Sequence, residues 1–233
     1  MASTLRHVNR LLSRIAARVG RLSRGGDEAR VARFKSYTMV PRQRYLDNLV
    51  LVRRCVGLDG AVVECGVWRG GMIAGVADVL GPQRAYILFD SFEGLPPAAE
   101  IDGEAALSWQ ADTTNRFYYD NCSAERRYAE DAMRLAGVEH PIIEQGWFED
   151  TIKPWTASAT PIAVLRLDGD WYESTMTCLV HLFPLVVTGG LVLIDDYGTW
   201  DGCTRAVHQY LADQQRPEAI DRTRSGVAYL IKR

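Results

Sequence analysis

The chain has 233 residues, of which 47% are hydrophobic and 24% are charged, and its formal net charge is -2. These values are typical of a globular protein with one large core, and the near-neutral charge gives no general reason to expect nucleic-acid binding. No apolar run approaches the roughly 20 residues that a membrane span needs.

The first 26 residues differ from the rest, because they carry six arginines and no acidic residue: Arg6, Arg10, Arg14, Arg18, Arg21 and Arg24. Apolar residues recur among them at intervals of three and four, as on one face of an amphipathic helix. A transit peptide or a membrane-surface helix shares this pattern. We favour an arm, residues 1–30, that packs on its own body or on a second subunit of a homo-oligomer. GGDEA at 25–29 reverses the charge and predicts a hinge.

From residue 31 to residue 233, apolar runs alternate with helix-like stretches. Helical spacing is found at 42–57, after Gly70, and at 123–138, 172–187 and 203–216. Strand-like runs are found at 61–67, 84–90, 141–148, 162–168, 190–196 and 226–233. Uninterrupted apolar strands that alternate with helices predict an α/β fold, a parallel sheet covered on both faces.

Two other features bear on organisation and location. Residues 94–122 have weak periodicity, and a loop of this length inside a domain is usually functional, so we expect a lid or acceptor loop at 98–122. The chain has five cysteines, an odd number without the close spacing of a zinc site. This pattern indicates reduced thiols and predicts a cytoplasmic protein.

The first predicted strand ends in VVECGVWRGG, and ligands of doubly wound sheets bind beyond the strand ends. Trp68 occupies the second glycine position of a G-x-G-x-x-G phosphate-binding turn, and Glu64 precedes the first glycine, Gly66. A carboxylate there suits an amino group better than a phosphate, and Asp90 after the second strand suits a ribose diol. Adenosine joined to a cationic amino acid is S-adenosylmethionine. The alternative is that Glu64 caps a helix and Asp90 merely ends a strand.

Acids also follow two later strands. Asp168, Asp195 and Asp196 come from strand ends that we expect to be adjacent, and three carboxylates without His or Cys favour Mg²⁺ or Ca²⁺ over zinc. Asp170 and its neighbours can instead cap the following helices. Several such caps at one sheet edge would repel each other without a cation or a proton. Four tryptophans just beyond predicted strands are candidate walls of an adenine or sugar pocket, although such aromatics also serve as core: Trp68, Trp147, Trp171 and Trp200.

Six segments, in order, resemble a known family: YTMV (37–40), VVECGVWRGG (62–71), FDSFEGLP (89–96), GWFEDTI (146–152), LRLDGDWYEST (165–175) and GGLVLIDDYGTWDGC (189–203). They resemble the macrocin-type O-methyltransferases, which methylate sugar hydroxyls on antibiotics such as macrolides and novobiocin. The resemblance implies a class I methyltransferase domain at residues 31–233. Its fold would be a doubly wound, mostly parallel seven-stranded sheet with helices on both faces and an N-terminal helical arm.

The resemblance also implies a role for each motif residue. Asp168, Asp195 and Asp196 would bind a required Mg²⁺, and Asp170 would be the general base beside the catalytic Asp168. S-adenosylmethionine would be held by a larger set: Thr38, Met39, Glu64, Gly66, Trp68, Arg69, Gly70, Asp90, Ser91 and Trp147.

The reaction implied by the resemblance is methyl transfer to a hydroxyl of a small-molecule acceptor, a glycosylated natural product or its sugar. Metal chelation of two neighbouring hydroxyls would lower the pKa of the reacting one, and Asp170 would accept its proton. Two alternatives stay open: the acceptor is a catechol or another phenolic diol, or the chain is a non-catalytic adaptor that binds a nucleotide-like ligand. The missing G-x-G-x-x-G disfavours a dehydrogenase.

Overall fold

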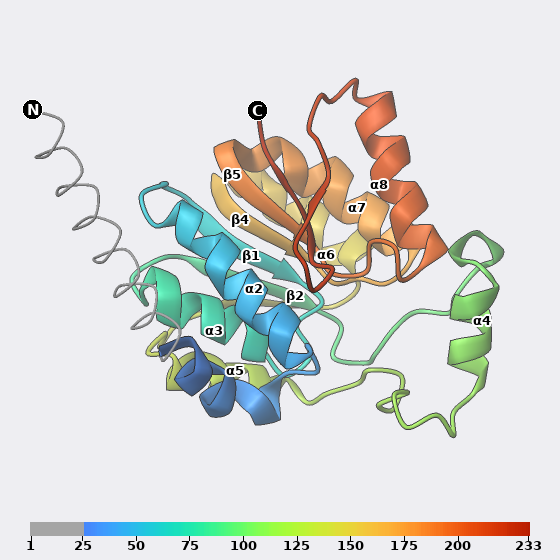
Figure 1. Ribbon diagram of the computed structural model, residues 1–233, viewed down its shortest axis with the longest axis horizontal. Helices are drawn as coiled ribbons and strands as arrows, with labels where there is room; N and C mark the ends of the chain where they lie inside the picture. The colour runs from blue at the N-terminus through green and yellow to red at the C-terminus, as the bar shows by residue number, and fades with distance from the viewer. Residues whose placement is uncertain (1–25) are drawn as a thin grey trace, which may run out of the picture.

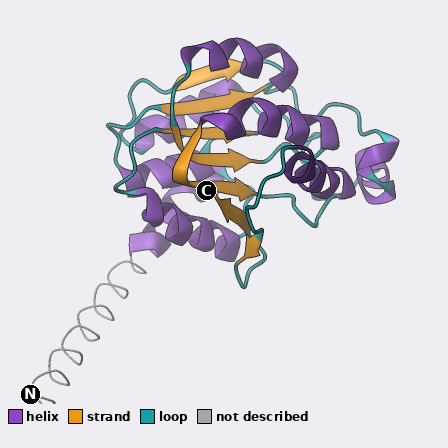
Figure 2. Cartoon of the chain, turned by 90° about the horizontal axis from the view of Figure 1, so that it is seen from above, coloured by secondary structure: helices purple, strands orange, loops and turns teal. Residues whose placement is uncertain are grey.

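The fold, in a computed structural model that describes residues 26–233, is a seven-stranded sheet between two layers of helices (Figures 1 and 2). Its strands are β1 (Ala61–Cys65), β2 (Tyr86–Asp90), β3 (Ile142–Gln145), β4 (Ile162–Leu167), β5 (Val186–Ile194), β6 (Asp221–Arg222) and β7 (Ala228–Ile231). The strand order is β3-β2-β1-β4-β5-β7-β6. The first five strands in this order are parallel, and β7 is antiparallel to both β5 and β6. The predicted mostly parallel seven-stranded sheet is therefore confirmed.

Helices cover both faces of the sheet, because the buried strands alternate apolar side chains between two cores. The helices are α2 (Arg42–Val52), α3 (Gly71–Leu80), α4 (Glu104–Ala111), α5 (Arg126–Leu135), α6 (Phe148–Trp155), α7 (Tyr172–Leu182) and α8 (Asp201–Asp213). Val62 of β1 and Val164 of β4 pack with α2, α3 and α5. Val63 and Leu165, one residue later in each strand, pack with α6, α7 and α8. No helix within residues 26–233 has the length and apolar character needed to cross a membrane.

The carboxyl ends of the central strands are held level with one another by backbone hydrogen bonds that continue past the strands. The Gly66 amide donates to the Phe89 carbonyl at 2.9 Å, and the Asp168 amide donates to the Cys65 carbonyl at 2.8 Å. The Asp195 amide donates to the Leu167 carbonyl at 2.9 Å. Residues that follow three different strands therefore lie side by side at one edge of the sheet.

Several element boundaries differ from the predicted ones. The expected loop at 94–122 contains α4, a helix of eight residues that stands away from the sheet (Figure 1). The predicted helix at 172–187 ends at Leu182, because Pro184 lies in a 3-10 turn and β5 already begins at Val186. The predicted strand at 141–148 ends at Gln145, and α6 follows it. Neither α6 nor the two-residue β6 was predicted.

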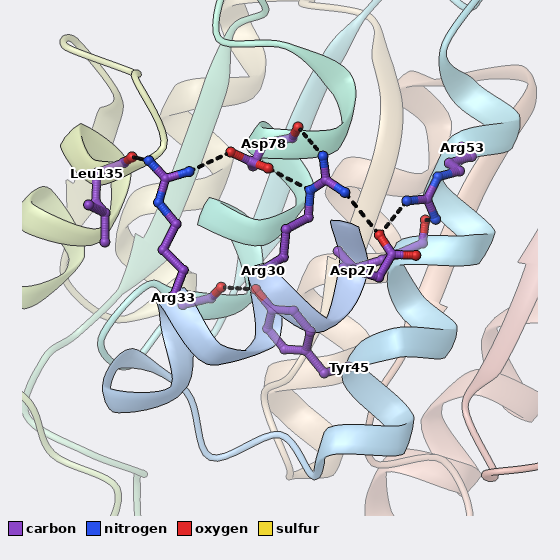
Figure 3. Close-up of polar contacts among 9 residues, drawn as sticks. Asp27, Arg30, Arg33, Tyr45, Arg53, Asp78 and Leu135 are labelled. Carbon is purple, nitrogen blue, oxygen red and sulfur yellow. Dashed lines mark hydrogen bonds and ion pairs between the residues drawn. The ribbon is translucent and has the colours of Figure 1, made fainter. Parts of the chain in front are cut away.

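The predicted hinge at 25–29 is wrong for the residues that the structure describes, since residues 26–34 form a helix. Residues 1–25, with most of the predicted arm, lie outside the described residues, so the arm stays a prediction. Asp27, 2% exposed, pairs with Arg30 and Arg53, and Asp78 of α3 pairs with Arg30 and Arg33 (Figure 3). These ion pairs fix the helix at 26–34 to α2 and α3.

Asp27→Asn should lower the free energy of unfolding by about 1–3 kcal/mol, because it removes the counter-charge of the partly buried Arg53 and one of the two counter-charges of Arg30. Glu28→Gln is the matched control, since the Glu28–Arg42 pair is 46% and 59% exposed and should contribute less than about 1 kcal/mol. Urea unfolding of both variants gives the comparison. Equal losses of unfolding free energy in the two variants would show that burial of Asp27 adds nothing to the stabilisation by its ion pairs.

Candidate active site

A cavity opens where β1, β2, β4 and β5 end. Strand order reverses direction between β1 and β4, and doubly wound sheets bind ligands at this point. Most of the predicted site residues line the cavity: Met39, Gly66, Trp68, Asp90, Ser91, Trp147, Asp168, Asp170 and Asp195. The fold thus brings together side chains from segments that are far apart in the sequence.

The turn after β1 depends on Gly66. Its φ is +83°, and a Cβ built on it would lie 1.8 Å from the Asp168 carbonyl oxygen, so no other residue fits without moving β4. Trp68 also has a positive φ, of 50°, which turns its ring into the cavity wall. Strain at a non-glycine residue is typical of ligand sites.

Asp90 at the end of β2 stabilises this turn. One carboxylate oxygen, Oδ2, accepts the backbone N–H groups of Val67 at 2.6 Å and Trp68 at 2.8 Å, and Oδ1 accepts that of Phe92 at 2.7 Å. Burial raises the pKa of Asp90, and these three hydrogen bonds oppose the rise. A carboxylate offers about four acceptor positions, so one remains for a ribose hydroxyl in the cavity. Structural and ligand-binding roles are therefore compatible.

Glu64 lies beneath the turn and is 1% exposed. Its Oε2 accepts the backbone N–H of Ile73 at 3.1 Å, in the first turn of α3, and its Oε1 accepts Nη1 of Arg166 at 2.7 Å. Glu64 therefore makes the contact with a helix N-terminus that the capping alternative expects. It is not part of the wall that the described residues form around the cavity, and its contact with a ligand stays a prediction.

Arg166 joins three of the acids. Besides Glu64, its guanidinium donates to Oδ2 of Asp168 and to Oδ1 of Asp195, each at 2.7 Å. Burial alone would lower the pKa of Arg166, but the negative charges of Asp168, Asp195 and Glu64 outweigh it and raise that pKa well above its usual value. Burial raises the pKa of Glu64 to about 7 in spite of its pairing with Arg166.

Asp168, Asp195 and Asp196 each offer one oxygen, and these three oxygens lie within 4.8 Å of one another. Burial, partly offset by Arg166, raises the pKa of Asp168 to about 6, and burial together with Asp170 raises that of Asp196 well above the usual range. Carboxylates that lie this close repel each other when ionised, and a bound cation would offset that repulsion. An all-oxygen donor set of this kind fits Mg²⁺.

Asp170 lies at the same edge with a different set of contacts. Its φ of 57° turns the chain back, so that its backbone N–H donates to Oδ2 of Asp196 at 3.0 Å. Its Oδ1 accepts the indole N–H of Trp200 at 2.8 Å. Burial, followed by the negative charge of Asp168, raises the pKa of Asp170 to about 7. A carboxyl with this pKa can accept a proton near neutral pH.

Four further predicted residues are not part of the wall that the described residues form around the cavity: Thr38, Arg69, Gly70 and Asp196. The Thr38 hydroxyl accepts the Val40 backbone N–H at 3.1 Å. The Arg69 guanidinium stacks on the rings of Trp68, at 4.3 Å, and Tyr128, at 4.8 Å. Gly70 is the N-cap of α3 with φ of 78°. They support residues of the wall, and direct contact with a ligand stays a prediction.

Sequence reasoning missed the part of Arg166 in the site and the contact of Trp200 with Asp170. Arg166 had a signal, because an arginine inside the apolar run IAVLRLD must find a counter-charge when that strand is buried. Trp200 was predicted only as a possible pocket aromatic, and its hydrogen bond to Asp170, 30 residues away, had no signal in the sequence.

The strand order, the glycine turn after β1 and the acid at the end of β2 together define a class I, S-adenosylmethionine-dependent methyltransferase. Comparison with known proteins agrees: the family of macrocin-O-methyltransferase (TylF) matches residues 8–230. The chain belongs to this family and is an S-adenosylmethionine-dependent O-methyltransferase.

Individual relatives give the same result. The chain is 33% identical over 193 residues to demethyldecarbamoylnovobiocin O-methyltransferase of Streptomyces niveus, covering 76% of this chain and 68% of that one. A second relative is 8-demethyl-8-(2,3-dimethoxy-alpha-L-rhamnosyl)-tetracenomycin-C 4'-O-methyltransferase of Streptomyces olivaceus. The two proteins are 36% identical over 188 residues, which cover 75% of this chain and 67% of that one. Among solved structures, the O-methyltransferase NovP superposes with a TM-score of 0.68 at 28% sequence identity. The superposition covers 84% of this chain and 82% of NovP.

Arg166→Met should lower the free energy of unfolding by about 3–5 kcal/mol at pH 8, because it leaves the buried Glu64 carboxylate without its counter-charge. The loss should shrink toward pH 5, since a Glu64 whose pKa is already about 7 takes up a proton on acidification and becomes neutral. Urea unfolding at both pH values gives the measurement.

The double variant Glu64→Gln/Arg166→Met controls for lost packing, since it removes the unpaired charge together with the arginine. It should recover part of the stability at pH 8. No recovery at pH 8, or a loss independent of pH, would contradict the ionic explanation.

Proposed function

We propose that this O-methyltransferase acts on a sugar hydroxyl of a glycosylated natural product, such as an antibiotic, with Mg²⁺ at the acid cluster and Asp170 as general base. The observation that carries the proposal is that the acidic residues at one edge of the cavity have two different sets of contacts. Three carboxylate oxygens lie within 4.8 Å of one another, whereas Oδ1 of Asp170 accepts a hydrogen bond from Trp200. The names of the two relatives, both O-methyltransferases of glycosylated antibiotics or their precursors, support the acceptor class.

The donor side of the cavity fits S-adenosylmethionine. Asp90 keeps one acceptor position for a ribose hydroxyl, and Trp68 and Trp147 supply aromatic surface on the wall. Gly66 lets the backbone approach the ligand without a side chain. We assign Glu64 an indirect part, through the first turn of α3 and Arg166, in place of the direct contact that the sequence predicted.

Asp168, Asp195 and Asp196 would hold the ion. When bound, Mg²⁺ supplies positive charge that lowers the pKa of two neighbouring sugar hydroxyls and favours the alkoxide. Asp170 accepts the proton of the reacting hydroxyl. The hydroxyl oxygen then forms a bond to the methyl carbon as the sulfur–methyl bond breaks, which leaves S-adenosylhomocysteine. Arg166 fixes one oxygen each of Asp168 and Asp195, so that the second oxygen of each remains for the ion.

The acceptor class is tested with labelled S-adenosylmethionine and three acceptors. These are demethyldecarbamoylnovobiocin, 8-demethyl-8-(2,3-dimethoxy-α-L-rhamnosyl)-tetracenomycin C, and catechol. We expect methyl transfer to at least one glycoside.

Asp170→Asn should lower kcat by about 10²–10⁴-fold without changing the affinity for S-adenosylmethionine, because it removes the proton acceptor. Asp213→Asn, an exposed acid at the end of α8, is the control. Preference for catechol would refute the sugar acceptor, and full activity of Asp170→Asn would refute the general base.

Metal binding is tested without any acceptor, by thermal unfolding with and without Mg²⁺. Saturating Mg²⁺ should raise Tm by about 5 °C or more at pH 8. The rise should be much smaller at pH 5, where Asp168, with a pKa of about 6, and Asp196 hold protons that the ion must displace. Without metal, stability should fall as pH rises from about 4 toward 7, because these raised-pKa carboxyls lose protons that stabilise the folded state.

Asp168→Asn should abolish most of the Mg²⁺-induced rise at pH 8. A rise of the same size at both pH values, or one that persists in Asp168→Asn, would place the ion elsewhere.

A further inference from the structure

Three tryptophans, from segments far apart in the chain, form a cluster beside Asp170. The ring centroids of Trp171 and Trp200 lie 5.4 Å apart, and Trp109 of α4 lies 6.2 Å from Trp171 and 6.0 Å from Trp200. Trp200 is the N-cap residue of α8, and Trp171 is the N-cap residue of α7. The Trp200 ring is thus fixed by its own backbone and by two neighbouring rings.

The two indole N–H groups on the α7 and α8 side of this cluster have different acceptors. Trp171 donates to the Pro96 backbone carbonyl at 2.9 Å, whereas Trp200 donates to Oδ1 of Asp170 at 2.8 Å. A hydrogen bond to a backbone carbonyl orients a loop. A hydrogen bond to a carboxylate at the cavity wall orients a group that can react.

The bond from Trp200 makes the two oxygens of Asp170 unequal. Oδ1 is occupied by the indole, and within residues 26–233 no hydrogen bond ends on Oδ2. The backbone of Asp170 is held as well, through its N–H on Asp196. Asp170 lines the cavity, so with its main chain and Oδ1 fixed, Oδ2 is the oxygen that remains to accept a further hydrogen bond.

We propose that Trp200 is a positioning residue for methyl transfer: its indole N–H fixes Oδ1 of Asp170 and thereby selects Oδ2 as the oxygen that takes the proton. The inference rests on the proposed role of Asp170 as general base. Contact with Trp109 adds a link to α4, so the same ring connects the 98–122 segment to the base.

The contact itself is tested by ¹⁵N NMR of the indole N–H signals of the full chain, assigned by Trp→Phe variants. Asp170→Asn should shift the Trp200 signal strongly and leave the Trp171 signal nearly unchanged, because only Trp200 donates to this carboxylate. Equal responses of the two signals would overturn the proposed contact.

The function is tested by comparing Trp200→Phe with Trp171→Phe, using whichever of the two glycoside acceptors is methylated. Each variant keeps an aromatic ring and removes one N–H from the same cluster. Trp200→Phe should lower kcat by about 10- to 100-fold, the effect of a lost hydrogen bond to a charged group. The KM for the acceptor and the affinity for S-adenosylmethionine should change less than about threefold, and Trp171→Phe should leave kcat within about threefold.

A double-mutant cycle separates positioning from packing. If Trp200 acts through Asp170, then Trp200→Phe should cause no further loss in the Asp170→Asn background. If Trp200→Phe disturbs folding, replacement of Trp200 by 3-benzothienylalanine keeps the bicyclic ring and exchanges the N–H for sulfur. Normal kcat in that protein would refute the inference.

The two proposals fail in different ways. Full activity of Asp170→Asn would refute the role of Asp170 as general base and, with it, the positioning role of Trp200. An impaired Asp170→Asn beside an unimpaired Trp200→Phe removes only the positioning role.

Discussion

The architecture of the site depends on one buried guanidinium. Arg166 is 3% exposed and pairs with carboxylates that belong to three neighbouring strands: Glu64 in β1, Asp168 after β4 and Asp195 after β5. A charge so deeply buried is tolerable only when its partners are close and well oriented. Glu64 and Arg166 are also direct neighbours in the β1–β4 ladder, so sheet register sets their approach. The donor turn above Glu64 and the acid cluster above Arg166 are therefore built on the same ionic contacts.

The charges at this edge do not balance within the described protein. Glu64, Asp168, Asp170, Asp195 and Asp196 face a single arginine, and burial raises the pKa of four of them. Such an arrangement is poor for stability, because replacing buried ionic groups by apolar ones is often neutral or favourable. Its retention is understandable at a functional site, where a protein accepts lower stability in exchange for chemistry. A surplus of negative charge favours the uptake of a cation or a proton at this edge.

How far the sequence predicts the structure depends on the range of the interaction. Strand and helix periods predicted the sheet, and the rule that ligands bind at strand ends predicted most of the cavity wall. The eight residues of α4 were missed because a short helix without an apolar stripe gives little signal. Whether Glu64 contacts the ligand in addition to α3 and Arg166 stays a prediction, because sequence cannot tell which partners a buried acid takes. Trp200 was predicted only as a possible pocket aromatic, and its contact with Asp170 was missed since that contact exists only after two strand-end segments meet.

The different contacts of Asp168 and Asp170 follow from the chain between them. Two residues apart on an extended strand, their side chains would lie on the same face and act as one cluster. Here β4 ends at Leu167, and Asp170 has a left-handed conformation with φ of 57°. The Trp171 amide then donates to the Gly169 carbonyl at 2.6 Å and closes a tight turn. Asp168 stays beside Arg166, and Asp170 turns toward Trp200 and Asp196. One short turn thus gives two nearby acids different partners, which is the condition for giving them different chemistry.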